Sequence, residues 1–263
     1  MPAAALVVDD TLPARETVVT AERQRRYHAG AGVDTALFGE LADVSILAND
    51  TIHATRHLNV DDGSGLQEVG LHLGQTLKQS EPIRLGEPLV AEGRVAATTP
   101  AARGTRTTFA FAFKRPNGSV PLVSEISSLR VDVNTMRGLG ESAAPEPFEA
   151  EGYTEALRVE LTPEKVADYS FEFPDYRVHF DMAVANGIGL RVPVAQGLMS
   201  LTWMLAALAA DGVPAELDLA AQFRRPVFWD ETVAAMIRDG RELAIVGGDG
   251  SARSRGRVHH LAR

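Results

Sequence analysis

The sequence has no cysteine among its 263 residues. That absence excludes a disulfide, a thiolate metal ligand and a cysteine nucleophile, although it does not fix the redox compartment. The histidines of the first half, His28, His53, His57 and His72, show no spacing typical of a metal site. We therefore expect no bound metal.

Positive charge and long apolar runs are also scarce. Lys and Arg number 26 against 35 Asp and Glu, which gives a formal net charge of -9. Because tight binding to a phosphate backbone needs a cationic surface, we expect no nucleic-acid partner. The longest nearly uncharged apolar run, residues 198–210, is too short to span a bilayer and predicts a helix buried on all sides.

The beginning of the sequence lacks the features of a secretory signal. It has no basic start, and Asp9 and Asp10 interrupt its apolar stretch. We therefore expect a cytoplasmic protein without membrane association. With 45% hydrophobic residues, the chain can bury a substantial core as one large domain or two smaller ones.

A faint internal repeat divides the chain into two halves. Thr20 and Thr162 each precede a predicted helix, and a hydroxyl at that position can cap the free amides of the first turn. Tyr27 and Tyr169 follow at the same offset. A proline then leads into a strand in each half. It is Pro82 in the first half and Pro226, five residues before Glu231, in the second. The repeat predicts that both halves share one architecture.

The remainder of each half is typical of an antiparallel meander. Short runs alternate between apolar and polar residues, and Gly-containing turns separate them. Phe109, Phe111 and Phe113 alternate in one run and are predicted to be core. The sequence thus favours an α+β fold with domains at 1–137 and 153–263 and a linker at 138–152. The predicted strands are 89–95, 105–114, 120–131, 217–223, 232–239, 242–246 and 257–261.

The second half contains the residues best suited to chemistry. Asp175 and His179 lie close together in a proline-containing loop, and Gly197 opens the buried apolar helix. A carboxylate can deprotonate water, a histidine can transfer protons near neutral pH, and amides at a helix start can stabilise a negatively charged oxygen. An isolated His–Asp pair is more often structural, so the helix that follows gives the hypothesis its weight.

This window resembles the MaoC-like dehydratase family, which includes (R)-specific enoyl-CoA hydratases. His179 and Asp181 match its His-x-Asp motif, and Gln196, Gly197 and Met199 stand where a His-Gly-Met helix start is found. The branch similar to mesaconyl-CoA hydratase and mitochondrial 3-hydroxyacyl-thioester dehydratase is nearest in this motif. The resemblance implies a double hot-dog fold, in which each half wraps an antiparallel sheet around a helix.

Two positions depart from the family pattern. The family acid lies five residues before the histidine, whereas Asp175 lies four before His179 and Pro174 takes the expected position. Gln196 replaces the histidine that precedes the glycine. The first half has no comparable motif and resembles a degenerate hot dog.

The resemblance implies reversible hydration of a 2-enoyl thioester of CoA or acyl-carrier protein, without a cofactor. Asp175 and His179 would activate water, and the amide of Gly197 would hold the thioester oxygen. We expect three further substrate contacts, from Arg177, Gln196 and Met199. A thioesterase on the same fold and a non-catalytic thioester-binding subunit are the alternatives, and a homodimer remains open.

Three smaller features receive structural interpretations. Gly30 and Gly32, like the Gly-Ile-Gly run at 187–189, are read as turns rather than a dinucleotide fingerprint. Asp181 is read as a helix cap. The arginines at 253, 255 and 257 are read as a solvated strand end, with phosphate or carrier-protein binding as the alternative.

Overall fold

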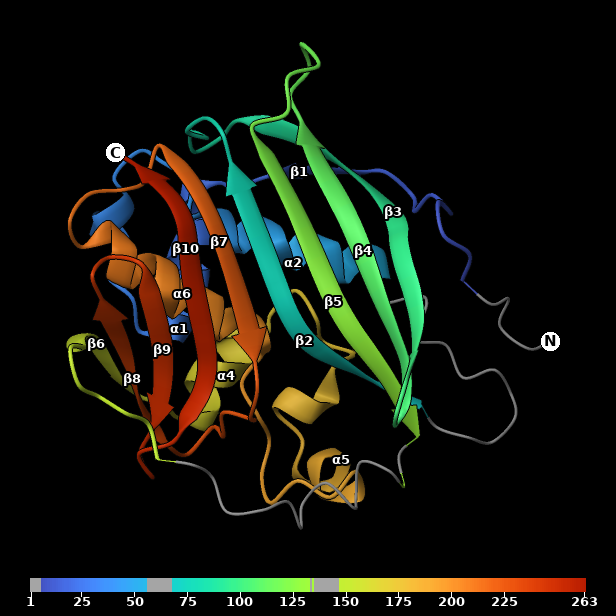
Figure 1. Cartoon of the computed structure of the whole chain (residues 1–263), viewed down its shortest axis with the longest axis vertical. Helices are drawn as coiled ribbons and strands as arrows, with labels where there is room; N and C mark the ends of the chain where they lie inside the picture. The colour runs from blue at the N-terminus through green and yellow to red at the C-terminus, as the bar shows by residue number, and fades with distance from the viewer. Residues whose placement is uncertain (1–5, 56–67, 133, 135–146) are drawn as a thin grey trace.

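The computed structural model describes residues 6–55, 68–132, 134 and 147–263. Its strands form one antiparallel ten-stranded sheet in the order β1-β3-β4-β5-β2-β7-β10-β9-β8-β6 (Figure 1). The first half supplies β1 (Arg15–Val18), β2 (Glu68–Gln79), β3 (Pro88–Ala101), β4 (Gly104–Lys114) and β5 (Leu122–Asp132). The second half supplies β6 (Thr154–Glu160), β7 (Glu216–Phe223), β8 (Thr232–Arg238), β9 (Glu242–Gly247) and β10 (Ala252–Ala262).

The two half-sheets have the same strand order and meet where β2 pairs antiparallel with β7. Gly74 lies opposite Gln222 at one end of this junction, and Gln79 lies opposite Leu217 at the other. A Cβ atom on Gly74 would lie 2.7 Å from the carbonyl oxygen of Ala221, so only glycine fits there. The predicted α+β fold is therefore one continuous curved sheet made from two related halves.

The helices cover one face of this sheet (Figure 1). They are α1 (Ala21–Ala31), α2 (Val44–Thr55), α4 (Pro163–Tyr169), α5 (Met182–Gly187) and α6 (Gly197–Ala209), with short 3-10 helices η1 (Thr35–Phe38) and η3 (Arg177–His179). Helices α2 and α6 pack against each other, and α1 packs against α4. Every residue of α6 from Leu198 to Ala209 is buried, as the apolar run predicted.

The internal repeat has a structural cause. The hydroxyls of Thr20 and Thr162 accept amide hydrogen bonds from residues three positions later, at 3.0 and 3.3 Å. The rings of Tyr27 and Tyr169 meet edge to face, with their centroids 4.9 Å apart. Equivalent positions therefore face each other across the junction of the halves, where α1 packs on α4.

The proline motifs also fold alike. Glu87 accepts a hydrogen bond from the amide of Arg84, and Glu231 accepts one from the amide of Phe228. In each half, two amide hydrogen bonds tie the backbone just before α2 or α6 to this motif. One of them runs from Ala42 N to Ile83 O (2.9 Å) in the first half and from Ala195 N to Val227 O (2.8 Å) in the second.

Most predicted elements are confirmed, and two details are corrected. Phe109, Phe111 and Phe113 are at most 3% exposed, as expected for core. Gly32 does end α1 in a left-handed conformation and Gly189 lies in a turn, but Gly30 and Gly187 are helical rather than turn residues. A Cβ on Gly30 would lie 2.6 Å from the amide nitrogen of Tyr169, so glycine permits α1 and α4 to approach closely. The boundaries at 137 and 153 stay predictions, and linker residues 138–146 lie outside the described residues.

The sequence did not predict strands β1, β2 and β6 or helix α2. Helix α2 has no clear sequence signal because it buries polar and β-branched residues, which have low helix propensity. They include Ser45, Asn49, Asp50 and Thr51, all 0% exposed. No helix among the described residues is long and apolar enough to cross a membrane.

Candidate functional site

The loop between α4 and α6 carries His179, and its imidazole is held in one tautomer. Nδ1 lies 2.7 Å from the carbonyl oxygen of Val194. Because a carbonyl oxygen can only accept, Nδ1 must carry the hydrogen. Nε2 of the neutral ring therefore presents a lone pair that can accept a proton or hold a water molecule.

His179 stays neutral over a wide pH range. Burial lowers its pKa to about 4, and the hydrogen bond to Val194 opposes this shift only in part. An imidazole with this pKa is a base, not an acid, in the resting protein at neutral pH. The side chain is only partly buried.

Helix α6 begins three residues after Val194, and its first turn offers hydrogen-bond donors. Gly197 is the first helical residue, and the amides of the first turn have no acceptor within a helix. Gln196 is the N-cap but does not cap its own helix through its side chain. Gln196 is 7% exposed, and its Nε2 finds no partner within the described part of the chain. A buried unsatisfied amide is costly, which makes it a candidate ligand-binding donor.

Gly197 is close to the sheet. A Cβ at this position would lie 3.0 Å from the ring of Phe223, at the end of β7. Glycine therefore lets the helix start pack directly on this ring. The predicted grouping of His179 with the start of α6 is present in the structure, because both are anchored at residues 194–197.

The other predicted site residues lie in different surroundings. Asp175 is exposed on the loop, four residues before His179. Arg177 is also exposed and forms an ion pair with Asp181. The Asp181 carboxylate caps α5, accepting from the amides of Ala183 (2.9 Å) and Val184. Asp181 is thus a helix cap, as predicted, and Arg177 has an ionic partner on its own loop.

Met199 lies within the core rather than at the surface of the site. It is 0% exposed, in the first turn of α6. Any substrate contact by this side chain would have to come from the buried end of the site. The predictions for Asp175, Arg177 and Met199 as functional residues stay predictions.

A partly buried ionic network holds the start of the loop between α4 and α6, and no local sequence pattern predicted it. Glu172 accepts two hydrogen bonds from Arg23, at 2.7 and 2.9 Å, and lies 3.2 Å from Nε2 of His53. Arg23 also pairs with Asp50, which is 0% exposed. Burial alone would raise the pKa of Glu172, but its hydrogen bonds to His53 and Arg23 lower it to about 2.

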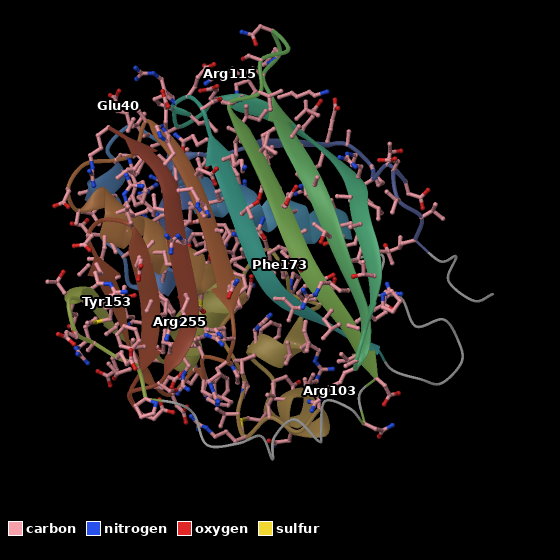
Figure 2. The ribbon with its side chains drawn as sticks, in the orientation of Figure 1. Glu40, Arg103, Arg115, Tyr153, Phe173 and Arg255 are labelled. Carbon is pink, nitrogen blue, oxygen red and sulfur yellow. The ribbon has the colours of Figure 1, made fainter. Side chains whose placement is uncertain are left out.

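An aromatic stack continues from this network toward His179. The ring of Phe173 stacks on His53, with a centroid distance of 4.3 Å, and Tyr176 stacks on the same Phe173 ring at 5.6 Å. The Tyr176 ring centroid lies 6.4 Å from that of His179. Figure 2 shows Phe173 near the middle of the molecule. The first half thus holds the loop of the second half through α1 and α2.

The equivalent position in the first half is closed. Asp43 precedes α2 as Gln196 precedes α6, but its carboxylate accepts from the amide of Ser45 at 2.9 Å. The other carboxylate oxygen bonds to His28 at 2.9 Å, and both side chains are 0% exposed. Val44 stands where α6 has Gly197. The carboxylate of Asp43 thus occupies the start of α2. This agrees with the prediction that the first half lacks the motif found around His179 and Gly197.

The basic run near the C-terminus corrects one interpretation. Arg253 is not solvated, because it is 7% exposed and forms hydrogen bonds with Glu231 and Ser251. It ties β10 to the second proline motif. Arg255 and Arg257 are exposed, as expected. Among the described residues, no three His, Cys, Asp or Glu side chains form a group that could hold a metal, and His57 lies outside those residues.

The fold and site define a class. The chain has the double hot-dog fold, and its second half brings His179 close to the start of α6. Its structural neighbours include MaoC-like dehydratases, which agrees with the family resemblance of the sequence. No family model matches the sequence, and no curated protein matches it at the significance required.

Three solved structures illustrate the similarity. HtdX from Mycobacterium tuberculosis is 15% identical with a TM-score of 0.72, covering 95% of this chain and 99% of HtdX. A MaoC-like dehydratase from Phytophthora capsici is 13% identical with a TM-score of 0.68, covering 99% and 98%. An acyl-ACP thioesterase from Bacteroides thetaiotaomicron is 10% identical with a TM-score of 0.57, covering 94% and 96%. At these identities the similarity establishes the fold alone.

Proposed function

We propose that the protein catalyses the reversible hydration of a 2-enoyl thioester to a 3-hydroxyacyl thioester. The observation that carries this proposal is the hydrogen bond from His179 Nδ1 to Val194, which leaves Nε2 as the acceptor of a ring held three residues before the start of α6. A base for water and a set of free amide donors are the two groups that this reaction needs.

In the hydration direction, Nε2 of His179 accepts a proton from water while the water oxygen bonds to C3. The electrons of the C2=C3 bond move toward the thioester carbonyl, and negative charge develops on its oxygen. The amide of Gly197 and Nε2 of Gln196 donate to that oxygen. The proton taken by His179 then returns to C2, so atoms and charge balance without a cofactor.

Asp175 has a supporting role in this proposal. Its carboxylate is exposed, whereas His179 is fixed by the backbone and partly buried. We therefore assign the base to His179 and propose that the carboxylate of Asp175 orients the water or stabilises the imidazolium that forms. This differs from the family pattern, in which the carboxylate is the base.

The test is an assay of purified protein with crotonyl-CoA and longer 2-enoyl-CoAs, following loss of the enoyl absorbance with chiral analysis of the product. Formation of (R)-3-hydroxyacyl-CoA that His179→Gln abolishes supports the proposal, whereas formation of free CoA overturns it. Asp175→Asn distinguishes the role of Asp175 from that of His179, because we expect it to lower the hydration activity less than His179→Gln does. Carrier-protein thioesters extend the panel if CoA esters are inert.

The thioesterase is the alternative with structural support, because one neighbour is described as an acyl-ACP thioesterase. In that reaction, the same base would direct water at the carbonyl carbon instead of C3. A tetrahedral oxyanion would then form at the start of α6. Release of free thiol, measured beside enoyl absorbance, distinguishes the two reactions.

A further inference from the structure

A second histidine, His72, lies beside the candidate site and comes from the other half of the molecule. Its ring meets the ring of Phe223 edge to face, with the centroids 4.7 Å apart. Phe223 is the residue that packs on Gly197 at the start of α6. His72 thus belongs to the same layer, between sheet and helices, as the predicted oxyanion donors.

A β-bulge places His72 on that face. The register of β2 against β5 shifts between His72 and Gly74, so Leu73 is an extra residue in β2. In a regular strand without the bulge, His72 would point to the same side as Gly74, because residues two positions apart lie on the same face. The bulge turns His72 to the side of Gln75, which is 1% exposed. Bulges of this kind often re-aim a side chain near an active site.

A directed chain of hydrogen bonds fixes the tautomer of His72. Its Nε2 lies 3.2 Å from the carbonyl oxygen of Gly74, which can only accept, and 3.0 Å from Oε1 of Gln75. The Gln75 amide is oriented in turn, because its Nε2 donates to Ser124 Oγ at 2.6 Å. Ser124 donates onward to the carbonyl of Thr76. The Nε2 of His72 therefore carries the hydrogen, and Nδ1 is the acceptor.

The acceptor atom is available. Burial lowers the pKa of His72 to about 4, so the ring is neutral at physiological pH. Nδ1 bonds to no described residue, and the side chain is only partly buried. Core packing alone does not require a histidine held by such a chain of hydrogen bonds. An apolar ring would fill the same space without three polar side chains that each need hydrogen-bond partners.

We propose that His72 binds the substrate, with Nδ1 accepting a hydrogen bond from the amide N–H of the pantetheine arm next to the thioester sulfur. The assignment rests on the thioester substrate proposed above and follows from its chemistry. The acyl part of a simple 2-enoyl thioester has only C–H bonds, so its first N–H donor is that amide. CoA and acyl-carrier protein share this arm.

The test compares two small substrates with and without the amide. Crotonyl-S-N-acetylcysteamine keeps the pantetheine amide at its natural distance from sulfur, and S-butyl thiocrotonate replaces it with an alkyl chain. We expect His72→Phe to raise KM for the first substrate about tenfold, the loss of roughly one hydrogen bond, and to change KM for the second by less than about twofold. The value of kcat should change little with either.

Two further variants and a control keep the comparison decisive. His72→Leu repeats it with a smaller side chain, in case the phenylalanine disturbs folding. His72→Asn places an acceptor near the position of Nδ1 and should recover much of the KM for the amide substrate. His259→Phe, an exposed change on β10, should leave both substrates unaffected. An equal effect on both substrates, or none on either, overturns the inference.

Binding measurements separate this inference from the proposed function. Butyryl-S-N-acetylcysteamine and S-butyl thiobutyrate are saturated and react in neither direction of hydration, so calorimetry gives their Kd directly. If the wild type hydrates no enoyl thioester but binds the amide ligand, the proposed reaction fails while the His72 variants still test the contact. A Kd that the His72 variants leave unchanged contradicts the contact even if hydration is observed.

Discussion

At the scale of single residues, two buried glutamines show how function and stability compete. Gln196 buries an amide nitrogen without a partner, whereas Gln24, at 0% exposure, donates to Leu41 O and accepts from the amide of Asp43. A buried polar group without a partner costs stability, and a bonded one does not. The arrangement at Gln196 makes sense if a substrate oxygen completes it.

We predict that Gln196→Leu lowers kcat about 100-fold, as expected when an oxyanion donor is removed. The free energy of unfolding should stay the same or rise by about 1 kcal/mol, because no hydrogen bond in the protein is lost. Enoyl-thioester kinetics and urea unfolding measure the two effects. The matched control, Gln24→Leu, should lower stability by about 2 kcal/mol because it leaves buried backbone groups unpaired. A large loss of stability in Gln196→Leu would show that its amide has a structural role.

The lowered pKa values of His72 and His179 predict how stability depends on pH. His72 and His179 both have a pKa lowered to about 4, against about 6.5 in an unfolded chain. Between these values, the unfolded state binds more protons than the folded state, so stability falls as pH falls from 6.5 toward 4. The paired Glu172, with a pKa of about 2, contributes no change above about pH 4.5.

Urea unfolding at pH 7 and pH 5 tests this expectation. The wild type should be less stable at pH 5, and the double variant His72→Gln with His179→Gln should lose much less stability between the two values. His260→Gln provides the control, because that side chain is exposed and pairs with Glu216 at the surface. If the double variant loses as much stability between pH 7 and pH 5 as the wild type, other groups cause the pH dependence.

At the scale of elements, the loop before α6 depends on helices of the other half. Arg23 on α1 and His53 on α2 both bond to Glu172, and the aromatic stack passes from there toward His179. A loop held in this way can keep an imidazole in one position without being part of a regular element. The ionic network therefore links the packing of the two halves to the geometry of the site.

Glu172→Gln should lower stability by about 2 kcal/mol, because it removes one of the two carboxylates that pair with the partly buried Arg23. We also expect kcat to fall while the KM of small thioesters changes little, since the variant displaces the base but none of the proposed substrate donors. Thermal unfolding and steady-state kinetics measure both. Glu22→Gln, an exposed change on α1, should affect neither. Full stability in Glu172→Gln would refute the supporting role of the network.

At the scale of the whole molecule, one sheet joins two halves that differ at the starts of α2 and α6. The helix start of the first half is closed by its own Asp43, and the start of α6 is open. The first half contributes to the site instead by holding the loop and by supplying His72 from β2. One chain therefore brings together the two hot-dog units whose junction forms the site.

The β2–β7 junction should be sensitive to a single methyl group. Gly74→Ala would place Cβ 2.7 Å from the Ala221 carbonyl oxygen, so we expect it to lower stability by more than about 2 kcal/mol. Gly248→Ala is the control, because its Cβ would lie 3.6 Å from the nearest atom, and it should change stability by less than about 0.5 kcal/mol. Equal effects of the two variants would show that β2 and β7 can move apart at Gly74 without loss of stability.

The sequence by itself determined the features that depend on neighbouring residues. Helix caps at Thr20 and Thr162, the buried helix after Gly197 and the strands of each meander follow from short-range patterns. The repeat predicted two similar halves, and the motif around His179 indicated the candidate site. Such signals survive because they arise from backbone hydrogen bonding and periodicity along the chain.

Only the tertiary structure decided which distant groups meet. Glu172 and Arg23 are 149 positions apart, and His72 meets Phe223 on the inner face of the sheet because the register of β2 shifts next to it. Whether an amide such as that of Gln196 has a partner is likewise a property of the folded interior. Pairing between distant residues leaves no local periodicity in the sequence, so these features could not be derived from it.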